Sequence, residues 1–268
     1  MKRFISFSLF LVLSVLTLSA QEKLLMQDVL YANRQDDYSA ERCKLDVWAD
    51  ETWKDTKHPI VVWFHGGGLV GGNKFIPEQL KNRGIAVVAA NYRFLYKVGI
   101  KECIDDAAAA VAWVFKHAEE FGGDTSRIYV SGHSAGGYLT SMVGLDKSYL
   151  SQYEIDADSI RALVPFSGQA MTHYEYRKMT GGSELAPTID ETAPIAHMRK
   201  DCPPYIIISG DRNLELYGRY EENAYMWRMM NLIGHPKCLL YELDGFSHGS
   251  MAEPAFYILS DYIRRDIK

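Results

Sequence analysis

The sequence predicts an α/β domain whose central sheet is mainly parallel and is covered by helices on both faces. Three observations indicate this fold class: short compact runs alternate with longer helical patterns, the short runs are rich in Val, Ile or Tyr, and Gly, Pro or Asp bound them. Such runs are typical of parallel strands buried on both sides. The expected strands cover residues 60–64, 85–91, 127–131, 161–166, 205–209 and 238–243.

Helices are expected between these strands, over 101–121, 134–145, 216–233 and 254–266. Apolar residues in 101–121 recur on one side of a helix, and these are Ile104, Ala107, Ala108, Val111, Val114, Phe115, Ala118 and Phe121.

Two earlier runs, 24–31 and 43–48, are interrupted by polar residues, so we expect antiparallel edge strands that are partly exposed. Residues 167–203 break the alternation with glycines and prolines, and we interpret them as a small, irregular, cap-like insertion over the sheet edge. We expect 21–268 to form one domain.

The first twenty residues are interpreted as a secretory signal peptide. Lys2 and Arg3 precede the apolar run 4–18, and Ala20 supplies a small residue at the expected cleavage site. The alternative is an uncleaved N-terminal anchor, but the run is short for a spanning helix. We therefore expect an exported protein, periplasmic or secreted, with no membrane span after cleavage.

Composition excludes several classes of function. The 268 residues are 47% hydrophobic and 24% charged, which is typical of a globular protein, and the net charge of −5 provides no basic field for nucleic acid. Four cysteines are scattered without a CxxC pair or a histidine at ligand spacing, so no metal site is predicted. We expect Cys43, Cys103, Cys202 and Cys238 to be buried thiols, with at most one disulfide among them.

The strongest chemical motif is the G-x-S-x-G stretch Gly132-His133-Ser134-Ala135-Gly136, at the junction of an expected strand and an expected helix. Glycines permit the tight turn that exposes the Ser134 hydroxyl at the carboxyl end of the strand. The following helix N-terminus offers free N–H groups to a developing negative charge. The motif predicts Ser134 as a nucleophile, against the alternative of a glycine-rich turn with an incidental serine.

A second motif, His65-Gly66-Gly67-Gly68, directly follows the first buried run. Consecutive glycines let the backbone approach a substrate and direct N–H groups toward the oxyanion of an acyl-transfer intermediate. We predict Gly67, Gly68 and Ala135 as the oxyanion donors and His65 as a structural residue of the loop. A phosphate-binding loop is the alternative, but no GK[ST] follows and the spacing does not fit GxGxxG.

A third motif contains the expected general base. Gly245-Phe246-Ser247-His248-Gly249 follows the last expected strand, so His248 should lie on the same rim of the sheet as Ser134. A lone loop histidine is usually only solvated, and the assignment of His248 therefore depends on its partners. Six other histidines lack such a setting, and these are His58, His117, His133, His173, His197 and His235.

Together these motifs resemble the alpha/beta-hydrolase fold, in its esterase and lipase branch that includes the hormone-sensitive-lipase-like carboxylesterases. That branch carries HGGG, GxSAG and GxxHG in this order, and Asn91-Tyr92-Arg93 is a further similarity. The resemblance covers roughly 40–266. It implies a Ser, acid, His triad with the acid after strand 205–209, and it is much less specific for substrate.

The acid departs from the family pattern. Many relatives have Gly-x-x-Asp in this loop, whereas this chain places Asn213 at the usual position. A neutral amide could orient the histidine but could not stabilise its cation. We favour Asp211 and keep Glu215 as the second candidate, while Glu242 and Asp244 are disfavoured by strand geometry.

The sequence therefore predicts a serine esterase that uses an acyl-enzyme and no cofactor. Expected substrates are small acyl esters on a soluble molecule, such as acetyl or aromatic acyl esters on carbohydrate, with residues 69–75, Tyr174, Tyr176 and Arg177 near the pockets. The alternatives are an amide hydrolase of the same fold, arylformamidase-like or peptidase-like, and a non-catalytic binder, which Asn213 favours. The motifs do not predict the oligomeric state.

Overall fold

The computed structural model describes residues 21–267 and confirms the α/β fold class with one eight-stranded mixed sheet. The expected signal peptide lies outside the described residues. Each expected strand is present to within a few residues. In chain order the strands are β1 (Lys23–Leu30), β2 (Lys44–Ala49), β3 (His58–Phe64), β4 (Ala86–Ala90), β5 (Gly123–His133), β6 (Ala162–Phe166), β7 (Tyr205–Gly210) and β8 (Cys238–Leu243).

The strands follow the spatial order β1-β2-β4-β3-β5-β6-β7-β8. From β4 to β8 every neighbouring pair is parallel, while β2 is antiparallel to both β1 and β4. The expectation of two edge strands at the N-terminus is therefore half correct, because β1 is the edge and β2 is internal. The polar residue Asp46 of β2 suggested exposure to solvent. Its side chain is instead used between the strands, because Asp46 Oδ1 accepts a hydrogen bond from the backbone N–H of Asp28 on β1 at 2.8 Å.

The second edge of the sheet is β8, which was expected to be buried on both faces. Alternate residues of this strand are instead exposed, with Leu239 at 37% and Tyr241 at 40%. Parallel strands inside a sheet are covered by helices on both faces. Among the described residues β8 pairs only with β7, so it forms the edge of the sheet and part of it stays exposed.

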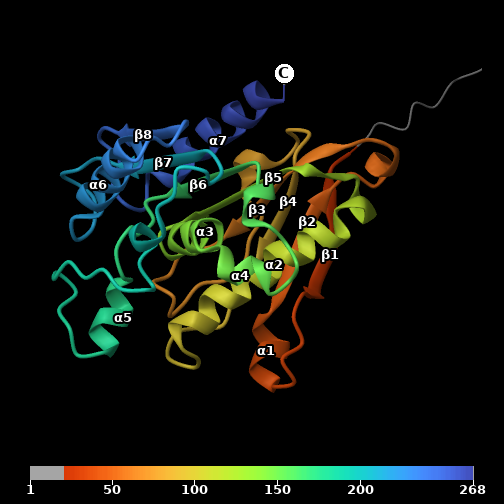
Figure 1. Ribbon diagram of the computed structural model, residues 1–268. Coiled ribbons are helices and arrows are strands. Elements are labelled where there is room, and N and C mark those ends of the chain that lie inside the picture. Colours follow the sequence, from red (N-terminus) through yellow and green to blue (C-terminus); the bar gives the residue numbers. More distant parts are fainter. Residues whose placement is uncertain (1–20, 268) are drawn as a thin grey trace, which may run out of the picture.

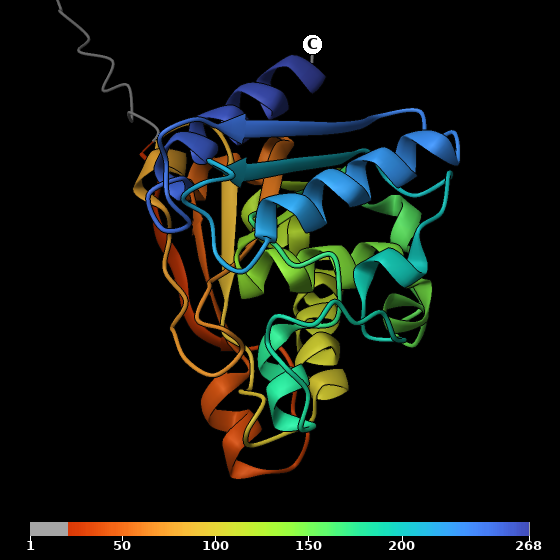
Figure 2. The same cartoon turned by 90° about the vertical axis from the view of Figure 1, so that its left-hand side faces the viewer.

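The helices cover the two faces unequally. The side chains of α2, α3 and α6 pack in one core with one face of the sheet, and those of α7 pack in a second core on the other face. Figure 1 shows α7 above the sheet with α2 and α3 below it, and Figure 2 shows α6 alongside the parallel β7 and β8. The α-helices are α1 (Asp37–Arg42), α2 (Ile100–His117), α3 (Ala135–Leu145), α4 (Lys147–Ser151), α5 (Tyr174–Met179), α6 (Arg219–Leu232) and α7 (Ala252–Asp266).

The irregular segment 167–203 connects β6 to β7 and contains α5 together with the 3-10 turn Pro194–His197. Because β6 and β7 are adjacent and parallel, this segment leaves the sheet at the carboxyl ends of the strands. Its α5 lies away from the sheet at the lower left of Figure 1. The same edge of the sheet carries the loops that follow β3, β5, β7 and β8, which contain the three predicted motifs and the expected acid.

The four cysteines are buried and free, so none of the possible disulfides forms. Burial raises the pKa of Cys43, Cys202 and Cys238 to about 12, which keeps these thiols protonated at neutral pH. Within residues 21–267, no helix has the length and apolar character needed to cross a membrane.

A buried ion cluster anchors the chain beside the glycine loop. Asp106 of α2 is fully buried and accepts two hydrogen bonds from the Arg93 guanidinium at 2.8 Å and one from Arg34 at 2.9 Å. It also accepts the backbone N–H of Arg93 at 3.0 Å. Arg93 follows Tyr92, whose hydroxyl donates to the carbonyl of His65, so this cluster connects α2 to the predicted oxyanion loop.

We expect Asp106→Ala to lower the free energy of unfolding by about 3–5 kcal/mol, because it leaves the buried Arg93 guanidinium without the carboxylate that it contacts at 2.8 Å. Urea denaturation followed by tryptophan fluorescence measures the change. Glu51→Ala is the control, since Glu51 forms an exposed pair with Lys23 and its loss should cost under about 1 kcal/mol. Equal effects of the two substitutions would contradict a structural role for the buried cluster.

Candidate active site

Ser134 lies on a strained turn between β5 and α3. Its backbone has φ 55° and ψ −114°, a conformation that a residue with a side chain rarely adopts. The Ser134 N–H donates to the Phe166 carbonyl at 2.8 Å, which connects the turn to β6. A Cβ on Gly136 would lie 2.1 Å from the Phe64 carbonyl oxygen, so only glycine lets α3 start this close to β3. The structure therefore contains the predicted tight turn, and Gly136 is a position in it that a larger residue could not occupy.

The structure brings Ser134, His248 and Glu215 into one hydrogen-bonded relay. His248 Nε2 lies 2.9 Å from Ser134 Oγ, and His248 Nδ1 lies 2.7 Å from Glu215 Oε2. An ionised carboxylate can only accept, so Nδ1 carries the proton and Nε2 accepts the hydrogen bond of the Ser134 hydroxyl. This is the arrangement that general-base activation of a serine requires.

Of the two candidate acids, the structure places Glu215, the second candidate, against His248, and it places Asp211, the favoured one, elsewhere in the loop. Asp211 Oδ1 accepts the backbone N–H of Asn213 at 2.8 Å, and Asp211 Oδ2 accepts the N–H of Gly245 at 2.8 Å. The Asn213 side chain donates to Asp211 rather than to His248. Both residues at the expected positions therefore hold the loop instead of contacting the imidazole.

Local backbone geometry explains why Glu215 is the residue that reaches His248. The N–H groups of Leu214 and Glu215 both donate to the Asp211 carbonyl at 2.9 Å, so the chain makes one tight turn directly after β7. That turn returns Glu215 to the end of the strand, where Glu215 Oε1 accepts the Gly210 N–H at 2.8 Å. The sequence signal for this turn is weak, because no glycine or proline marks 211–215.

Glu215 is held as a buried carboxylate, with its side chain only 1% exposed. Burial alone would raise its pKa. This effect is outweighed by the hydrogen bond and the charge of His248, and by hydrogen bonds from the Ser167 hydroxyl and the Gly210 N–H. Together they lower the pKa of Glu215 to about 2. Glu215 is therefore ionised at neutral pH and can stabilise a cationic His248.

Ser167 is a positioning residue that the sequence did not reveal. It is fully buried, follows β6 in a left-handed conformation with φ 45°, and donates its hydroxyl to Glu215 Oε1. The guanidinium of buried Arg219 donates to the Ser167 carbonyl. A serine after a strand carries no distinctive sequence pattern, which explains why it was missed.

The glycine loop lies directly against Ser134. A Cβ on Gly66 would stand 3.5 Å from Ser134 Cβ, and Gly67 and Gly68 have φ of 116° and 65°. Among the described residues, the N–H groups of Gly67 and Gly68 donate to no backbone or side-chain acceptor, and Ala135 begins α3 with its N–H likewise free. These three N–H groups, named from the sequence as oxyanion donors, are available to an oxygen beside Ser134.

Two neutral histidines support the loops. His65 Nδ1 donates to the Gly66 carbonyl at 2.6 Å, and its ring stacks on Tyr92 with centroids 4.4 Å apart. His133 Nε2 donates to the His248 carbonyl at 2.7 Å, a contact that the sequence did not indicate. Burial lowers the pKa of both His65 and His133 to about 4. Both are therefore uncharged at neutral pH and act structurally.

Of the expected pocket residues, Tyr174 reaches the glycine loop. Its hydroxyl lies 2.8 Å from the position that a Cβ on Gly68 would occupy. Arg177 is buried and donates to the Glu184 carbonyl at 2.5 Å, while Tyr176 packs against the large core. Leu69 is fully buried in that core as well. The structure thus places Tyr174 beside the glycine loop, whereas the contacts of Arg177, Tyr176 and Leu69 lie elsewhere.

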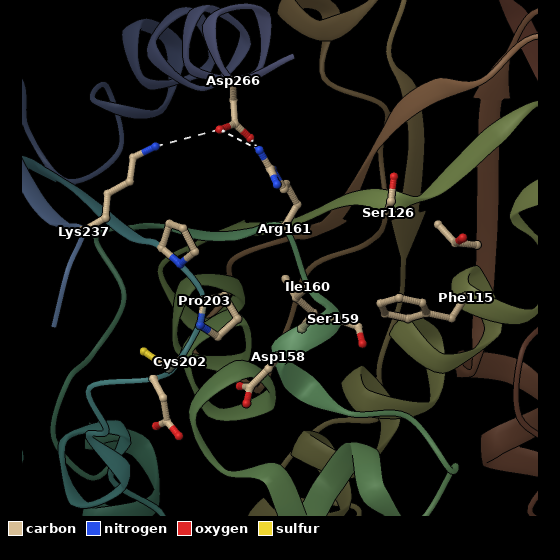
Figure 3. A pocket seen from close by; sticks show the side chains of 13 residues that line it. Phe115, Ser126, Asp158, Ser159, Ile160, Arg161, Cys202, Pro203, Lys237 and Asp266 are labelled. Atoms are coloured by element: carbon tan, nitrogen blue, oxygen red, sulfur yellow. Dashed lines mark hydrogen bonds and ion pairs between the residues drawn. The ribbon is translucent and has the colours of Figure 1, made fainter. Parts of the chain in front are cut away.

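A separate cavity of about 810 Å³ opens at the opposite end of the sheet, at the residues that precede β6, β7 and β8. Figure 3 shows Asp266 there between Lys237 and Arg161, with N···O distances of 3.8 and 2.7 Å. The charged side chains of Arg161, Lys237 and Asp266 in this cavity thus pair with one another. In the part of the chain that the structure describes, no group of three His, Cys, Asp or Glu residues is placed to hold a metal.

Comparisons with known proteins agree with this site. The BD-FAE family profile matches residues 45–215, more than half of the chain. A probable carboxylic ester hydrolase of Mycobacterium tuberculosis, LipM, is 27% identical over 62% of this chain and 44% of its own length. The chain spans about half the length of the curated relatives it matches.

Solved structures confirm the fold. A butyrate-bound esterase from Thermogutta terrifontis superposes with a TM-score of 0.69 at 21% identity, covering 92% of this chain and 94% of that one. A truncated carbohydrate esterase from gut microbiota gives 0.72 at 19% identity, covering 90% and 95%. The resemblance to the alpha/beta-hydrolase esterases and lipases is confirmed.

We expect Glu215→Gln to lower kcat about a thousandfold or more, since the neutral amide no longer stabilises the His248 cation. Asp211→Asn should lower kcat by roughly tenfold at most, because Asp211 does not touch the imidazole. Steady-state hydrolysis of p-nitrophenyl acetate measures both, and far-UV circular dichroism checks folding. A larger loss in Asp211→Asn than in Glu215→Gln would reassign the acid.

The buried histidines predict a pH dependence of stability. The pKa of His65 is about 4 in the folded protein and 6.5 in the unfolded chain, so the unfolded chain binds a proton more readily. The free energy of unfolding therefore declines as the pH drops from about 6.5 to 4. His65→Asn keeps a donor near Nδ1 but cannot titrate. We expect its free energy of unfolding, from urea titrations at several pH values, to fall less steeply over this range than that of the wild type. Identical slopes would contradict a neutral buried His65.

Proposed function

The chain belongs to the BD-FAE family, and on that premise we propose that it is a carboxylic ester hydrolase whose nucleophile is Ser134. The observation that carries the proposal is the relay from Glu215 through His248 to Ser134 Oγ, with contacts of 2.7 and 2.9 Å. This relay stands beside a glycine loop with free N–H groups. A serine, a base held in one tautomer and oxyanion donors together suit acyl transfer.

The first half-reaction forms an acyl-enzyme. His248 Nε2 takes the proton of Ser134 Oγ as the oxygen attacks the ester carbonyl carbon, and the carbonyl oxygen becomes negative. The N–H groups of Gly67, Gly68 and Ala135 donate to that oxygen. Glu215 accepts from Nδ1–H and stabilises the imidazolium. The ester C–O bond then breaks, and the leaving alcohol takes the proton from Nε2.

The second half-reaction releases the acid. A water molecule gives its proton to His248 Nε2 and attacks the acyl carbon, and the same N–H groups stabilise the second tetrahedral intermediate. Collapse of this intermediate breaks the bond to Ser134 Oγ, which recovers its proton from His248. No step in this sequence calls for a group outside the chain's own residues and water.

We further propose small acyl groups on a carbohydrate as the substrates. One solved neighbour is described as a carbohydrate esterase, and others as esterases with butyrate or propionate bound. Residues 167–203 add only the six-residue α5 and a 3-10 turn of regular structure above the sheet edge. A segment of this size supports a shallow site that admits an ester on a large polar molecule.

Two alternatives remain to be distinguished by experiment. An amide hydrolase would use the same residues, and the acetyl amide matching a good acetyl ester substrate tests for it directly. The non-catalytic binder was favoured by Asn213 alone. Because Glu215 supplies the carboxylate that Asn213 lacks, that reason for the binder no longer applies.

Export stays part of the proposal and rests on the charged start, the apolar run 4–18 and the small residue Ala20. Expression of the full-length chain in a bacterium and N-terminal sequencing of the periplasmic or secreted product tests it. We expect the product to begin at Gln21. Recovery of the protein with Met1 intact in the membrane fraction would indicate an anchor instead.

We expect a fluorophosphonate to label Ser134 stoichiometrically, with Ser134→Ala abolishing both labelling and turnover of p-nitrophenyl acetate. Intact-protein mass spectrometry measures the labelling. Ser247→Ala, which alters a hydroxyl beside His248 in the chain without touching the relay, is the matched control and should retain labelling. A folded wild-type protein that never reacts, or that turns over no faster than Ser134→Ala, would exclude a serine hydrolase.

A further inference from the structure

Two tyrosines from different loops meet beside the proposed catalytic residues. The ring centroids of Tyr174 and Tyr217 are 5.7 Å apart with a 46° tilt between the rings. Tyr174 begins α5 in the segment after β6, and Tyr217 follows Glu215 by two residues in the loop after β7. The pair thus joins Tyr174, which lies beside the glycine loop, to Tyr217, which stands on the loop that carries Glu215.

Tyr217 is held with its ring half-exposed. Tyr217 is 46% exposed, and its backbone is in the left-handed region with φ 46°. The turn continues through Gly218 at φ 69°, and the Arg219 N–H closes it by donating to the Leu216 carbonyl at 2.8 Å. A bulky residue in such a conformation costs free energy, which is typical of positions held for function.

Tyr174 presents a hydroxyl to the glycine loop. This hydroxyl lies 2.8 Å from where a Cβ on Gly68 would stand, so it faces the backbone of the glycine loop. The ring is fixed from behind by stacking on His173, a fully buried residue, with centroids 5.0 Å apart. Burial and the nearby Glu175 raise the pKa of Tyr174, so the hydroxyl keeps its proton and can donate.

Exposed apolar side chains also stand on the loops that carry Glu215 and His248. Leu214 is 48% exposed and Leu216 40% exposed in the Glu215 loop, and Phe246 is 40% exposed in the His248 loop. Apolar groups gathered on loops that also carry a relay of polar residues are typical of a binding site for an organic ligand.

We propose that Tyr174 and Tyr217 form a specificity subsite for a ring-bearing part of the ester. The Tyr217 ring would stack on the face of an aryl or pyranose ring, and the Tyr174 hydroxyl would donate to an oxygen of the same group. An aromatic side chain attracts either kind of ring through its π face and apolar area. This inference rests on the proposed function, because it assigns substrate contacts to that same site.

Three unactivated esters separate the possible positions of the ring. Ethyl acetate has no ring, methyl ferulate has one in its acyl half, and methyl 2-O-acetyl-β-D-xylopyranoside has one in its alcohol half. Acid release in a pH-stat gives kcat and KM for each. The ester whose kinetics respond to substitution identifies the half of the substrate that the tyrosines contact.

We expect Tyr217→Ala to lower kcat/KM for at least one ring-bearing ester by about 3- to 10-fold, mostly through KM, while ethyl acetate changes less than about twofold. Tyr174→Phe, which removes only the hydroxyl, should lower kcat/KM for the same ester by about 2- to 10-fold. Tyr225→Ala is the matched control, because Tyr225 on α6 is 48% exposed and contributes no contact to the relay. Its kinetics should match the wild type.

Other outcomes have distinct meanings. Equal losses for all three esters, or no loss for either ring-bearing ester, would overturn the subsite while leaving the hydrolase intact. A wild-type protein that hydrolyses none of the three esters and resists fluorophosphonate would instead overturn the proposed function. The urea midpoints of the variants, compared with that of Tyr225→Ala, exclude a loss of folding as the cause.

Discussion

The left-handed turn at Ser134 is the constraint on which the rest of the site depends. A serine at φ 55° is unfavourable in isolation, and its neighbours impose the conformation. The Ser134 N–H is bonded to β6, the Ser134 carbonyl accepts the Tyr138 N–H in α3, and Gly136 lets α3 begin against the Phe64 carbonyl. The energy that holds Ser134 in this conformation therefore comes from the packing of β3, β5, β6 and α3.

The histidine and the acid are joined by contacts that do not involve the reaction. Asp211 accepts the Gly245 N–H through its carboxylate, and its own N–H donates to the Phe246 carbonyl at 2.8 Å. His133 in the nucleophile turn donates to the His248 carbonyl. The loop after β8 is thus bonded both to the loop after β7 and to the end of β5. This bonding preorganises the relay, so little reorganisation is needed when charge develops on the imidazole.

Much of the fold and part of the site could be predicted from the sequence, and the successes share a cause. Buried parallel strands and the motifs around Ser134 and His248 are local patterns, and local patterns are what a sequence displays directly. The internal position of β2, the exposure of β8 and the choice of Glu215 over Asp211 depend instead on pairing order and on one backbone turn. Ser167 and His133 were invisible for the same reason, since their roles arise from contacts between distant segments.

The turn after β7 also means that the carboxylate beside His248 comes from a sequence position other than the one that spacing after the strand suggests. One tight turn brings the carboxylate to His248 from five residues beyond Gly210. The strand specifies where in space a negative charge must stand, and the following loop can supply it from more than one position. The presence of Asn213 three residues after Gly210 is therefore compatible with a charged partner for His248, because Glu215 brings its carboxylate to the same point, and a spacing rule applied to the sequence alone would overlook it.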